Sequence, residues 1–221
     1  MPDAICYMCD RPASSREHVP PRSFFPIGQR EGLWTVPSCP VHNLDNSKDV
    51  EYVRNVICIQ RGTNATAEEA FEVAKRSWDR SPALFHRTFH DLRGVEIGGE
   101  ETGIFPFDLA RVKRVILAVA HALAYRDFGR EYIGQWHVFC ATLLSRTPAP
   151  KWNDLRNMLM SAQFEPIATP KPDVFAYAIH RTEPVGVIYR LTLYEAFVVF
   201  TWPVVKGGAY PPPSQQVPPA G

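Results

Sequence analysis

The chain has 221 residues, 45% of them hydrophobic, so it is long enough to bury a core as one large domain or two smaller ones. Its 24 Lys and Arg residues nearly balance its 23 Asp and Glu residues, so charge alone indicates no nucleic-acid partner. No apolar run reaches the roughly 18 residues of a membrane span, and the N-terminus does not resemble a secretory signal. We therefore expect a cytoplasmic protein without a membrane partner, whose five cysteines are metal ligands or buried thiols rather than disulfides.

The first 61 residues are irregular and rich in Pro, Cys, Asn and Asp, with only short apolar patches. Such a composition supplies little core, which indicates a module held together by something other than packing. Toward its end, residues 47–60 predict a helix, because Val50, Val53 and Ile57 fall on one stripe, with Cys58 beside them.

Residues 62–205 alternate helical and strand patterns. A capping box at 66–69 predicts that Thr66 starts a helix ending near Trp78, and a short helix is expected over 81–93, before a glycine-rich turn at 94–103. From Pro106 the longest helical pattern becomes apolar nearly all round, as in a helix at the centre of a core. A strand (136–144), a helix (152–163) and two or three antiparallel strands (173–181 and 185–202) follow.

These patterns predict an α+β protein in three parts. The parts are a zinc-braced module at 1–61, an α+β domain of unknown role at 62–205, and a Pro-rich tail at 206–221 that we expect to be disordered.

Two short pairs in the first module have the spacing of a zinc site. Cys6 and Cys9 form C-x2-C, and Cys39 and His42 form C-x2-H directly before the expected helix. Three thiolates and one imidazole form a closed tetrahedral set, which favours structural rather than catalytic Zn²⁺. The alternative is two coincidental pairs in a loop region. Cys58 and Cys140 lie on apolar stripes and are expected to be inert core thiols.

Within residues 6–55, the order of C-x2-C, "EHVPP", "VPSC", C-x2-H and Asn43 resembles the HNH endonucleases, whose ββα-metal fold is often braced by a zinc knuckle. The resemblance covers about a quarter of the chain. It implies hydrolysis of DNA phosphodiesters to 5′-phosphate and 3′-hydroxyl ends, with His18 as general base. Glu17, at a strand distortion, and Asn43 would bind a catalytic Mg²⁺ or Mn²⁺. A neutral imidazole can accept a proton from water at pH 7, and one carboxylate and one amide oxygen suit a hard cation.

The sequence departs from the family pattern at two positions. Where the family often has a middle Asn that tethers the loop of the catalytic His, this chain has Trp34 or Thr35. Thr35 can supply one such hydrogen bond, but less completely than an amide. The residue before His18 is Glu rather than the more frequent Asp, which shifts the ion by one methylene. Both leave room for a module that binds but does not cleave.

Several charged residues and histidines are weaker candidates. Arg16, Arg22 and Lys48 flank the motif and are candidate phosphate contacts, although such residues are more often solvated surface charges. Asp49 and Glu51 suit the first turn of a helix better than a metal site. His86 and His90 have i, i+4 spacing but lack a nearby glutamate, so we expect semi-buried packing; His121 is expected to be a core histidine.

Two functions from different classes therefore stand at this stage. The first is a metal-dependent HNH-type endonuclease acting on DNA, with RNA not excluded and with a protein partner open for residues 62–205. The second is a non-catalytic, zinc-stabilised module that binds nucleic acid or protein. The balance of seven basic and seven acidic residues in 1–61 favours the second, and the presence of Glu17, His18 and Asn43 favours the first.

Overall fold

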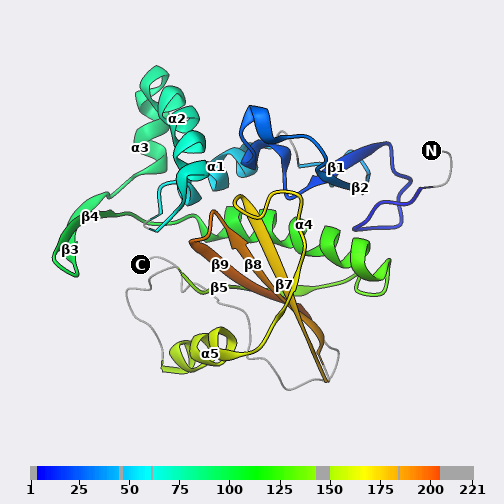
Figure 1. Ribbon diagram of the computed structural model, residues 1–221. Helices are drawn as coiled ribbons and strands as arrows, with labels where there is room; N and C mark the ends of the chain where they lie inside the picture. The colour runs from blue at the N-terminus through cyan, green and yellow to red at the C-terminus, as the bar shows by residue number, and fades with distance from the viewer. Residues whose placement is uncertain (1–3, 45–46, 61, 143–149, 184, 205–221) are drawn as a thin grey trace, which may run out of the picture.

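A computed structural model describes residues 4–44, 47–60, 62–142, 150–183 and 185–204, and Figure 1 shows the arrangement of their helices and strands. The fold mixes helices and strands, as the sequence patterns predict. The tail predicted to be disordered, 206–221, lies outside the described residues. Among the described residues, no helix has the length and apolar character needed to cross a bilayer.

The N-terminal part is a pair of short strands followed by a helix. Strand β1 (Ser15–Val19) pairs antiparallel with β2 (Trp34–Ser38), and two 3-10 turns, η1 (Arg22–Phe24) and η2 (Ile27–Gln29), lie between them. Helix α1 (Lys48–Ile57) follows, and the Ser47 side chain caps it by accepting a hydrogen bond from the Val50 backbone N–H at 3.1 Å. The predicted helix is confirmed, and its apolar stripe is buried.

The next segment corrects three predictions. Helix α2 (Ala65–Arg80) is capped by Asn64, which accepts from the Ala67 backbone N–H at 3.2 Å, and not by Thr66. The Thr66 hydroxyl instead donates to the Asp173 carboxylate at 2.6 Å. After the short helix α3 (Pro82–Thr88), the region predicted as a glycine-rich turn forms a hairpin of β3 (Arg93–Ile97) and β4 (Glu100–Ile104). The expected helix over 81–93 therefore ends five residues early.

A five-stranded antiparallel sheet forms the C-terminal half. Its strand order is β5-β9-β8-β7-β6, and the strands are β5 (Trp136–Cys140), β6 (Glu165–Ile167), β7 (Phe175–Thr182), β8 (Gly186–Leu193) and β9 (Phe197–Pro203). Helix α4 (Leu109–Phe128) packs on one face and helix α5 (Pro150–Ser161) on the other. Strand β9 is buried along its whole length because both helices cover it, whereas β7 and β8 alternate buried with half-buried residues.

Helix α4 lies at the centre of the molecule, between the sheet and the N-terminal strands and α1 (Figure 1). The helix has apolar residues on nearly all of its sides, and this explains its position. A helix that is hydrophobic all round is stable only when neighbours cover every side. One hydrophobic core extends from Cys6 and Tyr7 through α4 to Tyr194 and Val199, across the sequence boundary at 61 and 62. The N-terminal residues thus share their core with the rest of the chain.

Candidate functional site

The four predicted zinc ligands converge at one place. The Sγ atoms of Cys6, Cys9 and Cys39 and a ring nitrogen of His42 all lie within 4.8 Å of one another. His42 Nδ1 is 3.5 Å from Cys6 Sγ and 3.4 Å from Cys39 Sγ, and the sulfurs of Cys9 and Cys39 are 3.9 Å apart.

These separations fit a tetrahedral zinc ion. Bonds of about 2.3 Å to sulfur and about 2.0 Å to nitrogen give tetrahedral edges of about 3.8 Å between sulfurs and about 3.5 Å between sulfur and nitrogen. The four residues can therefore hold a metal, and their donor set is that of a closed, structural zinc site.

Backbone hydrogen bonds form the two turns that carry the ligands. In the first turn, the Cys6 N–H donates to the Arg11 carbonyl at 2.9 Å. The second turn begins where β2 ends, and the His42 and Asn43 N–H groups both donate to the Cys39 carbonyl, at 3.0 and 3.1 Å. A bond of 2.9 Å from the Tyr7 N–H to the Pro37 carbonyl joins the two. The cluster thus fixes the N-terminal turn to the β2–α1 connection.

Arg130, which follows α4, contacts the first turn of the cluster, and burial affects its histidine. Arg130 donates through Nη1 to the carbonyls of Cys6 and Cys9, at 2.9 and 3.2 Å, and its Nη2 pairs with Asp10. Burial, together with nearby Arg11, lowers the pKa of His42, which keeps the ring in the neutral form that a metal ligand requires. The role of Arg130 was missed from the sequence, because nothing local marks a contact across more than 120 positions.

Glu17 lies directly beside the loop that carries Asn43. Its side chain is 2% exposed, and one carboxylate oxygen accepts a hydrogen bond from the Leu44 backbone N–H at 2.6 Å. Asn43 reaches back to the strand, with its amide nitrogen donating to Ser15 Oγ at 2.9 Å and to the Arg16 carbonyl at 3.3 Å. The structure therefore brings together two of the three predicted catalytic residues.

His18 follows Glu17 on β1 and points to the other face of that strand. Glu17 and Val19 are buried, whereas Arg16 is exposed and His18 is half-buried, which is the alternation of a regular strand. The pairing of Glu17 with Val36 and of His18 with Thr35 is uninterrupted, so the strand distortion expected at Glu17 is absent. The His18 ring is accessible to solvent, but it does not share a face with the Glu17 carboxylate.

The two residues in place of the family's middle Asn have other partners. Thr35 Oγ1 accepts from Arg16 Nε at 2.5 Å, and the Thr35 carbonyl accepts from the same guanidinium at 2.9 Å. The Trp34 ring lies 3.6 Å below the Arg126 guanidinium and contacts Tyr177 edge-on at 6.0 Å. Thr35, which pairs with His18 across the two strands, thus holds Arg16 at their surface.

The candidate phosphate contacts lie on the surface around these strands. Arg16, Arg22 and Lys48 are all exposed. Next to Lys48, Asp49 pairs with Nε of Arg111 and with Nε of Arg114, each at 2.7 Å. The hydrogen bonds from both arginines lower the pKa of Asp49, whose carboxylate links α1 to α4. This contact supports the structural interpretation of Asp49 over a metal role.

The remaining cysteines and histidines discussed above are either buried in the core or exposed on the surface. Cys58 and Cys140 are buried, and burial raises the pKa of each thiol to about 12, as expected of inert core residues. His121 is buried against Trp136, as predicted. His86 and His90 are exposed, so the prediction of semi-buried packing was wrong. Helix α3, which carries His86, and its C-terminal cap pack through Thr88 and Phe89 instead.

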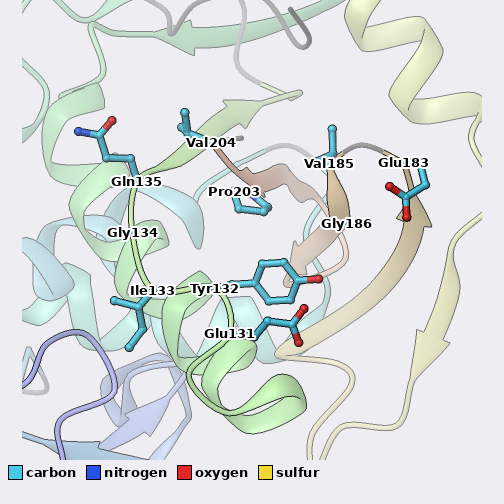
Figure 2. A pocket seen from close by; sticks show the side chains of 10 residues that line it. All are labelled: Glu131, Tyr132, Ile133, Gly134, Gln135, Glu183, Val185, Gly186, Pro203 and Val204. Atoms are coloured by element: carbon cyan, nitrogen blue, oxygen red, sulfur yellow. The ribbon is translucent and has the colours of Figure 1, made fainter. Parts of the chain in front are cut away.

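A hollow of about 400 Å³ lies at the end of the sheet, between the α4–β5 connection and the start of β8 (Figure 2). Tyr132 occupies its floor, and a side chain at Gly186 would lie 2.8 Å from the Tyr132 hydroxyl, so the glycine makes room for the ring. Glu131 and Glu183 border the hollow and are exposed. Two solvated carboxylates around a packed tyrosine do not form a catalytic arrangement.

Comparison of the chain with family models, with curated proteins and with solved structures finds no match.

Proposed function

We propose that the protein is a metal-dependent endonuclease of the HNH type that hydrolyses phosphodiester bonds in DNA. In this proposal, Cys6, Cys9, Cys39 and His42 hold structural Zn²⁺, and β1, β2 and α1 form the ββα-metal module. His18 is the general base, and Glu17 and Asn43 are the ligands of a catalytic Mg²⁺ or Mn²⁺. Arg16, Arg22 and Lys48, which are exposed, contact the phosphates that flank the scissile bond.

The observation that carries the proposal is the contact between Glu17 and the loop of Asn43. These residues are 26 positions apart, and the hydrogen bond from the Leu44 N–H to Glu17 supports this ligand pair, because Leu44 directly follows Asn43 in the loop. A carboxylate oxygen and an amide oxygen form a donor set that suits a hard divalent cation. When bound, such a cation stabilises the charge that develops on the phosphate in the transition state.

The zinc cluster supports this arrangement mechanically. With zinc bound, it joins the end of β2 to the turn before β1 and so keeps the strand of Glu17 beside the loop of Asn43. Two residues of the chain then have roles in the reaction besides the metal ligands. The half-buried His18 ring accepts a proton from the attacking water, and the exposed Arg16, held by Thr35, orients a phosphate by charge.

One observation favours the non-catalytic alternative. Glu17 and Asn43 both make hydrogen bonds that join β1 to the loop before α1, and His18 points to the opposite face of the strand. Residues that serve only to hold a strand against a loop would have these same contacts. In that case the module is a zinc-stabilised scaffold that binds nucleic acid or protein without cleaving it.

A plasmid-nicking assay separates the two functions. We expect the purified protein to nick supercoiled DNA with Mg²⁺ or Mn²⁺ and to lose about 100-fold or more of this activity in His18→Ala, because a general base contributes that much. His86→Ala is the matched control, since His86 is exposed on α3 and lies outside the module.

Two results would contradict the proposal. One is nicking that is equal in the wild type and in His18→Ala, which points to a contaminating nuclease. The other is no cleavage of DNA or RNA by zinc-loaded protein that binds nucleic acid, which supports the scaffold.

A further inference from the structure

Three arginines lie together where η1 meets α1. Arg22 is the first residue of η1, and the backbone N–H of Phe25 donates to its carbonyl at 3.1 Å. Arg30 donates through Nε to the Phe25 carbonyl at 2.9 Å, so its guanidinium lies against the end of that turn. Arg54 is on α1, which packs on η1. We call these three residues the arginine cluster.

The hydrogen bonds that hold Arg30 and Arg54 leave the charges of both in place. Arg30 donates to a backbone carbonyl, and Arg54 donates through Nε and Nη2 to the side-chain oxygen of Asn55, at 3.0 and 2.7 Å. Asn55 is 2% exposed, so the anchor of Arg54 belongs to the core. Both acceptors are neutral. They orient the two guanidinium groups without cancelling their charge.

The charges of the cluster repel one another. Burial lowers the pKa of Arg30, and the nearby charges of Arg22 and Arg54 lower it further. A like charge nearby disfavours the charged form of a group, whereas an opposite charge favours it. A bound anion would therefore relieve the repulsion that folding creates here. The cluster is suited to an anionic ligand.

The position of the cluster favours a phosphate of a nucleic acid over other anions. Arg22 lies four residues after His18, the proposed general base near the end of β1. A nucleic-acid strand carries one phosphate for about each 3.4 Å of its axis, so a strand at His18 offers further phosphates to cations close by. A guanidinium also matches a phosphate through two parallel N–H bonds. Repeating phosphates can meet several such cations at once, which a single small anion cannot.

We propose that Arg30 and Arg54, together with Arg22, bind a backbone phosphate of the nucleic acid. The site adds two half-buried arginines to the exposed cations named above and extends the contact surface from β1 across η1 to α1. The inference rests on the proposed function for the identity of the polyanion as DNA. It does not require cleavage, because a phosphate contact also serves a module that only binds.

Binding of a labelled DNA duplex at several salt concentrations tests the site, with zinc-loaded protein and no added Mg²⁺ or Mn²⁺. Each cation of the protein that neutralises a phosphate contributes about one to the slope of log affinity against log salt. We expect Arg30→Gln and Arg54→Gln each to weaken binding about 10-fold at low salt and to reduce this slope by about one.

Two further variants separate a lost charge from a disturbed fold. Arg30→Lys loses the Nε bond to the Phe25 carbonyl but keeps the charge, so it should keep most of the salt slope. Arg156→Gln is the matched control. It removes an exposed arginine of α5, which lies across the sheet from α4 and the N-terminal strands (Figure 1), and should bind DNA like the wild type. Circular dichroism verifies that each variant is folded.

Three results overturn the proposal. The first is binding by Arg30→Gln and Arg54→Gln that equals that of the wild type. The second is weaker binding with an unchanged salt slope, which points to a structural role. The third is wild-type protein that does not bind DNA, whether or not inorganic phosphate stabilises it.

The nicking assay keeps this test separate from that of the nuclease. Wild-type protein that nicks DNA while both glutamine variants bind normally refutes only the phosphate site. Protein that binds DNA through these arginines but does not nick it refutes only the nuclease.

Discussion

Glu17 is the residue whose environment is least expected for its type. A carboxylate is costly to bury unless hydrogen bonds or opposite charges compensate it, and this residue is 2% exposed on a short strand. The N–H of Leu44 donates to it at 2.6 Å and offsets part of that cost. This hydrogen bond joins β1 to the loop before α1, and in the proposed function the same carboxylate also binds a cation.

His121 allows a prediction at the same scale, about pH and stability. Burial, with His42 as a smaller cause, lowers the pKa of His121 to about 4, against about 6.5 in an unfolded chain. The unfolded state therefore binds more protons between these values, so stability falls as the pH drops below about 6.5 and levels off near the folded pKa. The loss approaches about 3 kcal/mol.

Urea denaturation of the wild type and of His121→Gln from pH 7 to pH 4.5, with zinc in excess, measures this loss. Protonation of the zinc ligands affects both proteins and cancels in the difference. We expect the advantage of the wild type over the variant to shrink as the pH falls. Two curves that stay parallel would show that His121 titrates alike in the folded and unfolded states.

The residues of the candidate site were predictable to different degrees. The Cys and His cluster that can hold a metal was predicted because C-x2-C and C-x2-H spacing reflects the geometry of a tetrahedral ion, which is local to each turn. The orientation of His18 was not found, since the sequence cannot tell a regular strand from a distorted one. Arg130 was missed because it binds the carbonyls of Cys6 and Cys9, which exist in every sequence.

At the scale of elements, periodicity predicted the helices better than their ends. The apolar stripes of α1 and α4 survive because tertiary packing uses the same faces. The capping box at Thr66 failed because Asn64 caps the helix two residues earlier, and the Thr66 hydroxyl donates to Asp173 instead. The β3–β4 hairpin was mistaken for a turn because four glycines hide the short alternation of its strands.

Asn64 provides a prediction about α2. Its side chain caps the helix and also donates to the Asp173 carbonyl at 2.6 Å, so it joins the helix start to the segment before β7. Asn64→Ala loses both bonds and should cost about 2 kcal/mol of unfolding free energy. Ser47→Ala, which removes only the cap of α1, is the comparison and should cost about 1 kcal/mol. Equal losses in urea denaturation would show that the bond to Asp173 adds nothing.

At the scale of the whole molecule, the N-terminal module is joined to the rest by more than apolar contact. The Tyr194 hydroxyl donates to the Phe24 carbonyl at 2.6 Å, Asp49 binds two arginines of α4, and Arg130 binds the first cysteine turn. Sequence composition predicted a module at 1–61 that depends on metal for its stability. It could not show that α4, which is apolar all round, would make the core of that module continuous with the sheet.

This continuity predicts that zinc stabilises the entire chain. Removal of zinc by a chelator, or by Cys39→Ser, should lower the melting temperature by about 10 °C or more, because the metal contributes several kcal/mol of folding energy. Near-UV circular dichroism, which reports the packing of aromatic side chains, and zinc release followed by a colorimetric chelator should give one coincident transition. Cys140→Ala, which changes a buried thiol on β5 outside the cluster, should keep one zinc per chain. Zinc release well before the loss of the near-UV signal would instead mean that the module unfolds alone and that α4 does not couple it to the sheet.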